Sequence, residues 1–193
     1  MVDAPRHFRI FISSPGDVAE EREIALKLIE DLPYDPSLRG RVTLEAVAWD
    51  KKGAPLLATI TPQEAVNQGL PLPSECDIVI VIFWSKMGTP LPFPEYRKEK
   101  GDPYHSGTDW EYEDAYKSAK ATGFPFVIVY RRTEVPSFLP TDPDFLKKYE
   151  QWQKVQTFFS SFSEAETGAG LGGYNSYLKA ENFKDLLDTH LKN

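Results

Sequence analysis

The sequence predicts an α/β fold in which helices cover both faces of a parallel sheet. Segments rich in β-branched and aromatic residues alternate with segments of helical periodicity along the chain. Residues 77–84 are almost continuously apolar, which is typical of a strand covered on both faces. The length of 193 residues suits one domain of this class better than two.

Local signals predict the elements in order. The expected strands are residues 8–12, 42–49, 77–84 and 124–130, with a short edge strand at 174–178. The expected helices begin at Asp17, Thr61 and Thr108, and two more follow over about 142–162 and around 183–191. The first three starts match the capping-box pattern, with Glu20, Glu64 and Glu111 three residues on.

This alternation predicts a flavodoxin-like, three-layer α/β/α architecture with about five parallel strands in the order 2-1-3-4-5. In such a sheet, a ligand crevice lies outside the carboxyl ends of strands one and three. We expect one domain over residues 1–193, with a core at 8–135 and a helical tail at 141–193. We also expect it to be the N-terminal part of a longer protein.

Composition narrows the classes of function. The net charge of −7 argues against a nucleic-acid binder, which needs a basic surface. No apolar run is long enough to cross a membrane, and residues 1–7 contain no apolar signal core. The single cysteine, Cys76, fits a reducing compartment and a role as a small apolar core residue. We therefore expect a cytoplasmic protein without nucleic-acid or membrane partners.

The acid-rich segment 106–115 is the main candidate for chemistry, because it opens a helix beside the expected crevice. Glu111 could contact a bound sugar or cation, or it could only cap the helix. Helical geometry predicts that Glu111 and Glu113 flank the buried face, and that both are partly exposed. Trp110 falls opposite that face, so it could contact a partner or pack under the long loop that precedes the helix, and we favour packing.

Two other patterns resemble known ligand-binding motifs, but each also has a plain structural interpretation. The turn 13–17 could offer backbone N–H groups to a phosphate, or it could be a turn that caps the next helix. It lacks the lysine and spacing of a Walker loop. The glycines of 168–173 match a dinucleotide fingerprint only formally, because they follow a helical pattern, so a linker is expected there. The three histidines and Cys76 show no metal-ligand spacing, so no metal site is expected.

Several segments together resemble the DUF4062 family. These are divergent Toll/interleukin-1 receptor (TIR)-like domains found at the N-termini of bacterial NACHT or STAND proteins, which are NLR-like. The matching segments run in order through residues 8 to about 130: FISSPGDVAEER at 11–22, TPQ at 61–63, SECDIV at 74–79, WSKMGTPLP at 84–92 and SGTDWEYEDA at 106–115.

The resemblance implies a flavodoxin-like effector or signalling domain of an immune protein. Many TIR domains hydrolyse NAD⁺ with a glutamate on the helix after the third strand, usually four residues after a tryptophan. Here that position is Asp114, and the nearby glutamates are Glu111 and Glu113, so the choice of acid stays open. The alternative is a non-catalytic TIR-like module that only self-associates or binds proteins.

If the enzyme interpretation holds, NAD⁺ or a related nucleotide is a substrate and no prosthetic group is needed. The implied partners are other copies of the domain and a downstream NACHT or STAND region of the same chain. Catalysis is expected from Glu111 or Glu113. The expected nucleotide-binding residues lie on the loops after strands one, two and three: Ser13, Ser14, Asp17, Trp49, Asp50, Trp84 and Ser85.

Overall fold

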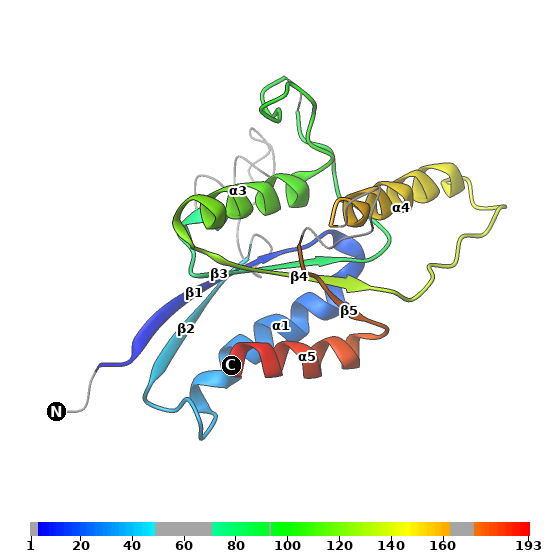
Figure 1. Cartoon of the computed structure of the whole chain (residues 1–193). Helices are drawn as coiled ribbons and strands as arrows, with labels where there is room; N and C mark the ends of the chain where they lie inside the picture. Colours follow the sequence, from blue (N-terminus) through cyan, green and yellow to red (C-terminus); the bar gives the residue numbers. More distant parts are fainter. Residues whose placement is uncertain (1–3, 49–70, 93, 163–171) are drawn as a thin grey trace, which may run out of the picture.

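The computed structural model describes residues 4–48, 71–92, 94–162 and 172–193. Within these residues, five parallel strands form one sheet in the order β2-β1-β3-β4-β5 (Figure 1). The strands are β1 (Arg6–Ser13), β2 (Val42–Val47), β3 (Ile78–Phe83), β4 (Phe126–Arg132) and β5 (Asn175–Tyr177). This order confirms the predicted flavodoxin-like topology.

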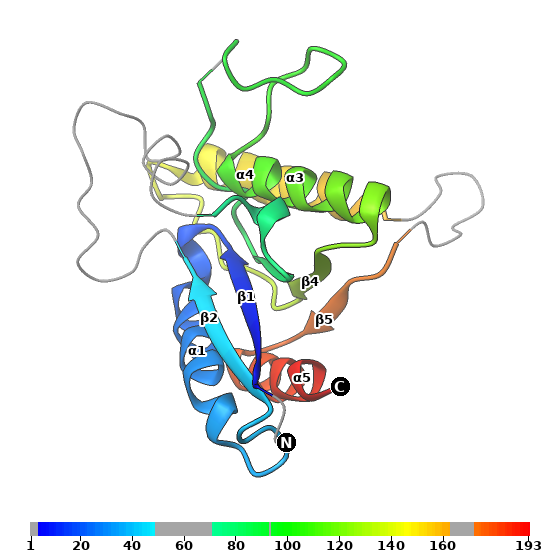
Figure 2. The same cartoon turned by 90° about the vertical axis from the view of Figure 1, so that its left-hand side faces the viewer.

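Helices cover both faces of the sheet and complete a three-layer α/β/α arrangement. Helices α1 (Ala19–Asp31) and α5 (Ala180–Lys192) lie on one face, and α3 (Gly107–Thr122) and α4 (Phe145–Ser160) lie on the other (Figures 1 and 2). The tail thus contributes the fifth strand and one helix to each face. The loop between β3 and α3 extends beyond the layers (Figure 1).

The core has two parts because successive strand residues face opposite sides of the sheet. Ile10 and Ile12 belong to the cluster packed under α1 and α5, whereas Phe11 belongs to the cluster under α3 and α4. All residues of β3 from Val79 to Phe83 have no solvent exposure. This two-sided burial is the reason that β3 reads as a continuous apolar run.

Strand register brings the carboxyl ends of three strands together. Ser13, the last residue of β1, pairs with Val81 of β3, and Phe83, the last residue of β3, pairs with Arg131 of β4. The segment after β3 therefore lies beside the β1–α1 turn. This is the sheet edge at which the sequence predicts a crevice.

Two helix starts differ from the predictions. The N-cap of α3 is Ser106, whose hydroxyl accepts a hydrogen bond from the Asp109 backbone N–H at 3.1 Å, so the predicted cap at Thr108 is wrong. Helix α1 begins at Ala19 after a 3₁₀ turn over Gly16–Val18, and no side chain caps it. The capping-box pattern failed at Asp17 because that carboxylate binds a different segment of the chain. The predicted helix at 61–69 lies outside the described residues.

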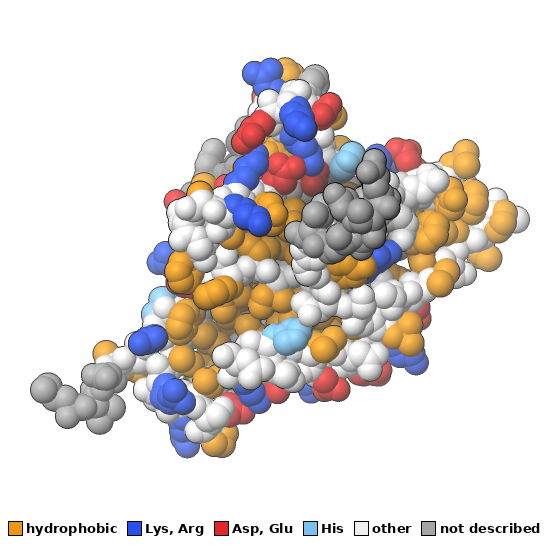
Figure 3. All heavy atoms as spheres, in the orientation of Figure 1, with side chains coloured by type: hydrophobic (Ala, Val, Ile, Leu, Met, Phe, Trp, Pro, Cys, Tyr) orange, Lys and Arg blue, Asp and Glu red, His pale blue; other side chains and the backbone are white. Residues whose placement is uncertain are grey.

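Large apolar side chains are exposed at the N-terminal end of α4 and in the segment before it, including Val135, Leu139 and Leu146 (Figure 3). Charged side chains of both signs gather on the loop that projects past α3 (Figure 3). In the part of the chain that the structure describes, no helix combines the length and apolarity needed to cross a membrane.

Candidate functional site

Glu111 lies in the first turns of α3 and is only 3% exposed. The hydroxyl of Ser13 donates a hydrogen bond to Glu111 Oε2 at 2.6 Å, which joins α3 to the end of β1. The prediction that Glu111 is partly exposed is therefore wrong. The buried stripe of α3 runs through Thr108, Glu111 and Ala115, at spacings of three and four residues. Apolar periodicity missed this stripe because polar residues form two of its three positions.

Glu113 occupies a different environment on the outer side of α3. Its side chain is 22% exposed and contacts Lys98 Nζ at 2.6 Å and Lys117 Nζ at 3.4 Å. Lys98 also contacts the buried Asp109 at 3.1 Å. Burial opposes the charge of Lys98, but the hydrogen bond that it donates to Glu113 and the charge of Asp109 raise its pKa overall. Glu113 is thus partly exposed, as predicted, and is held by two lysines.

Trp110 packs against the long loop, as predicted. Its ring meets that of Tyr96 edge to face, with centroids 6.0 Å apart. Together with the Lys98 ion pairs, this contact fastens the projecting loop to the start of α3.

Hydrogen bonds from Arg22 hold the β1–α1 turn in place. Its Nε donates to Ser14 Oγ at 2.8 Å, and its Nη2 donates to the carbonyl oxygens of Ser14 at 3.2 Å and Pro15 at 3.0 Å. Ser13 and Ser14 are buried, at 0% and 2% exposure. These contacts and this burial fix the turn in place.

Asp17 joins this turn to the segment after β3. Its Oδ2 accepts hydrogen bonds from the backbone N–H of Ser85 at 2.8 Å and from the Ser85 hydroxyl at 2.9 Å. Its Oδ1 is buried and accepts no hydrogen bond from the described residues. The structure therefore brings two predicted site residues from different loops into direct contact.

A second buried carboxylate, Glu21, lies on the α1 side of the same sheet edge. Glu21 has no solvent exposure, and its Oε1 accepts from Arg132 Nη1 at 3.0 Å and from the Tyr177 hydroxyl at 3.1 Å. The Arg132 guanidinium stacks over the ring of Trp84 at 4.2 Å, and the Trp84 indole N–H donates to the Glu134 carbonyl at 2.8 Å. One face of Trp84 is thus already covered.

Sequence reasoning did not single out Glu21, Arg22 or Arg132. A signal existed for Arg22, because it shares the helical stripe of the buried residues Ala25 and Ile29. A charged residue in register with an apolar stripe needs a buried partner. Arg132 carried no such signal, because its buried partner Glu21 lies 111 residues away in the sequence.

Several other predictions concern residues away from this edge or outside the described ranges. Trp49 and Asp50 lie outside the described residues, as does most of segment 168–173. Cys76 is buried among apolar side chains, and burial raises the pKa of its thiol to about 12, which suits a core residue. Among the residues described, no group of histidine, cysteine and acidic side chains could hold a metal ion.

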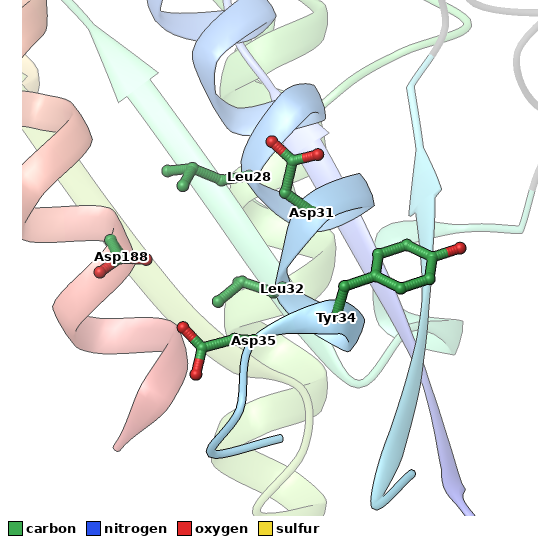
Figure 4. Close-up of a pocket in the computed structure, with 6 residues that line it drawn as sticks. All are labelled: Leu28, Asp31, Leu32, Tyr34, Asp35 and Asp188. Atoms are coloured by element: carbon green, nitrogen blue, oxygen red, sulfur yellow. The ribbon is translucent and has the colours of Figure 1, made fainter. Parts of the chain in front are cut away.

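A surface hollow of about 380 Å³ lies between the C-terminal ends of α1 and α5 (Figure 4). Because both helices run back from the carboxyl ends of the strands, this hollow is at the opposite end of the sheet from Glu111. Lys192 contacts Asp35 at 3.0 Å and Asp188 at 2.9 Å beside it. Hydrogen bonds from Ser37, followed by Lys192, lower the pKa of Asp35 to about 2. The acids of this hollow therefore have internal partners.

No family model matches this chain, and no curated protein matches it.

Proposed function

We propose that this chain is a TIR-like effector domain that hydrolyses NAD⁺ at the bond between nicotinamide and ribose, with Glu111 as the catalytic carboxylate. The observation that carries the proposal is the position of Glu111. It is buried at the carboxyl edge of the sheet and accepts a hydrogen bond from Ser13, the last residue of β1. The resemblance of segments 11–22 and 106–115 to TIR-like domains supplies the class of reaction.

The chemistry needs one carboxylate beside the ribose. When the bond between nicotinamide N1 and ribose C1′ breaks, its electron pair neutralises the nicotinamide nitrogen, and C1′ gains oxocarbenium character. A carboxylate stabilises that positive charge, most strongly where water is excluded. Water then adds to C1′ and releases a proton, which gives ADP-ribose. Glu111 can fill this role because its oxygen already accepts a hydroxyl hydrogen bond, which a ribose hydroxyl can replace.

The environment of Glu113 favours Glu111 over it. Two lysines contact the Glu113 carboxylate, so its charge is largely balanced before a substrate binds. Glu113 also lies on the loop side of α3, away from the β1–α1 turn. We therefore assign Glu113 to fastening the loop.

The remaining site residues have supporting roles in this proposal. Ser14, Asp17 and Ser85 shape the rim of the crevice through their fixed contacts. Trp84, Trp49 and Asp50 stay candidates for nucleotide contacts. Self-association, a downstream NACHT or STAND region and a cytoplasmic location in an immune protein belong to the same proposal.

A non-catalytic TIR-like interaction module is the second candidate function. The contact that supports catalysis also favours this candidate, because a buried carboxylate bonded to a serine hydroxyl can serve simply to join α3 to β1. In that case Glu111 contributes to stability and no substrate is turned over.

Nicotinamide release separates the two candidates. The chain is incubated with NAD⁺ at high protein concentration and also fused to an oligomerising partner. In Glu111→Gln, which keeps the size and the acceptor oxygen, release should fall about 100-fold or more. Glu113→Gln is the matched control and should keep activity within about threefold. Persistent release in Glu111→Gln would exclude Glu111 as the catalytic acid, and no release under any assembly would favour the interaction module.

A further inference from the structure

We propose that Lys86 binds the pyrophosphate of the dinucleotide at this edge of the sheet. This inference rests on the proposed nucleotide ligand. Lys86 follows Ser85 directly after β3, at the point between β1 and β3 where a doubly wound sheet opens to ligands. Its side chain is exposed, whereas the side chains on either side of it, Ser85 and Met87, are buried.

The backbone around Lys86 is fixed from both directions. Asp17 accepts hydrogen bonds from Ser85 on one side. On the other side, Gln151 Oε1 of α4 accepts from the backbone N–H of Met87 at 3.0 Å and of Gly88 at 3.3 Å. A lysine presented on a rigid segment loses less entropy when it binds an anion than one on a mobile loop.

Charge balance at this edge leaves Lys86 available. Arg132 is neutralised by Glu21 and Glu134, and Lys98 by Asp109 and Glu113. Lys86, by contrast, forms no ion pair with any described residue.

An anionic ligand needs such a cation here. The carboxylates of Asp17 and Glu111 lie at this edge, and they repel a pyrophosphate group. Lysine binds phosphate as a compact point charge and needs no particular plane of approach. Lys86 can therefore hold the phosphates while the ribose next to nicotinamide reaches Glu111.

Equilibrium binding and kinetics of the 193-residue chain test this assignment, with three probes: NAD⁺, inorganic pyrophosphate and nicotinamide riboside, which has no phosphate. In Lys86→Gln, the Kd for NAD⁺ and for pyrophosphate should rise about fivefold, and the KM for NAD⁺ should rise equally at unchanged kcat. Nicotinamide riboside should be unaffected. Lys120→Gln is the matched control, since Lys120 is an exposed lysine in the last turns of α3.

The outcomes separate this inference from the proposed function. If Lys86→Gln binds pyrophosphate and NAD⁺ as tightly as the unmodified chain, the lysine assignment is wrong, although Glu111 can still be catalytic. An equal loss in Lys120→Gln also overturns it, because the effect is then only one of net charge. If pyrophosphate binding depends on Lys86 but no nicotinamide is released, the anion site stands and the hydrolase proposal fails.

Discussion

Glu21 and Glu111 are the two buried glutamates of the described chain, and they lie on opposite faces of the same sheet edge. Glu21 contacts an arginine and a tyrosine hydroxyl on the α1 side. Glu111 accepts a hydrogen bond from the hydroxyl of Ser13 on the α3 side. Their burial is nearly equal, so burial alone cannot tell a structural carboxylate from a catalytic one.

The two glutamates differ in the groups that they contact. Arg132 has a fixed geometry and is itself held by Glu134 and stacked on Trp84, so a ligand would have to break several contacts to reach Glu21. The Ser13 hydroxyl is a neutral donor, and a substrate hydroxyl can take its place on Glu111 Oε2 without a change in charge. Under the proposed function, Glu21 is therefore the structural acid of the pair and Glu111 the catalytic one.

The largest expected effect is on the Glu21 side. Arg132→Met leaves Glu21 buried without its cation and should lower the free energy of unfolding by about 3–5 kcal/mol. Urea denaturation measures this change. The matched control is Arg131→Met at the neighbouring position of β4. Arg131 faces α4, donates to Gln156 Oε1 at 2.5 Å and lies over the ring of Phe159 at 4.6 Å, so its loss should cost about 1–2 kcal/mol without leaving a buried charge unpaired.

A double variant sharpens this test. Adding Glu21→Met to Arg132→Met removes the uncompensated charge and should restore part of the lost stability, because an apolar pair replaces a buried ion pair at little cost. Equal losses in the two single arginine variants, or no recovery in the double variant, would show that the Glu21–Arg132 contact is not a tightly coupled pair.

A smaller effect is expected at the hydrogen bond on the other face. Ser13→Ala removes the donor to Glu111 Oε2 and should lower the free energy of unfolding by about 1–2 kcal/mol. If Ser13 orients the catalytic acid, kcat for nicotinamide release should also fall about tenfold at unchanged KM. Ser14→Ala is the control, because the Ser14 hydroxyl serves Arg22 and not Glu111. Ser13→Thr, which keeps the hydroxyl, should recover activity, and a positioning role is excluded if it does not.

The sequence predicts the strands better than the side-chain contacts of this edge. The nearly continuous apolar run at 77–84 predicts a strand covered on both faces, and β3 confirms it, because Val79 to Phe83 have no solvent exposure. The short edge strand expected at 174–178 is also confirmed, as β5 over Asn175–Tyr177. Sequence patterns are sufficient to predict a strand when the burial of each residue follows from its position in that strand.

Polar contacts between residues far apart in the sequence were not predicted. Asp17 reads as a helix cap, but it binds Ser85, which is 68 residues away in sequence. Glu111 reads as a cap or a partly exposed acid, but it meets Ser13 across 98 residues. A capping pattern reports only which donors lie within one turn. It cannot show that a more remote donor competes for the same carboxylate, so the contact between Glu111 and Ser13 could not be predicted from spacing alone.

The smallest expected effect on stability concerns Glu113, a third glutamate, whose side chain is 22% exposed and contacts two lysines. Lys98→Gln removes its contacts at 2.6 Å to Glu113 and at 3.1 Å to Asp109. We expect a loss of about 1 kcal/mol in the free energy of unfolding, because the Lys98 side chain is only 27% exposed and Asp109 is 2% exposed. Lys117→Gln, at a lysine side chain 46% exposed, should cost no more than about 0.5 kcal/mol.

Raising the salt concentration to about 1 M should abolish the Lys117 effect and leave part of the Lys98 effect, since salt screens exposed pairs more than covered ones. If both effects vanish together in salt, the loop is held to α3 only by surface charge, and the contrast between Glu113 and the buried glutamates is one of degree.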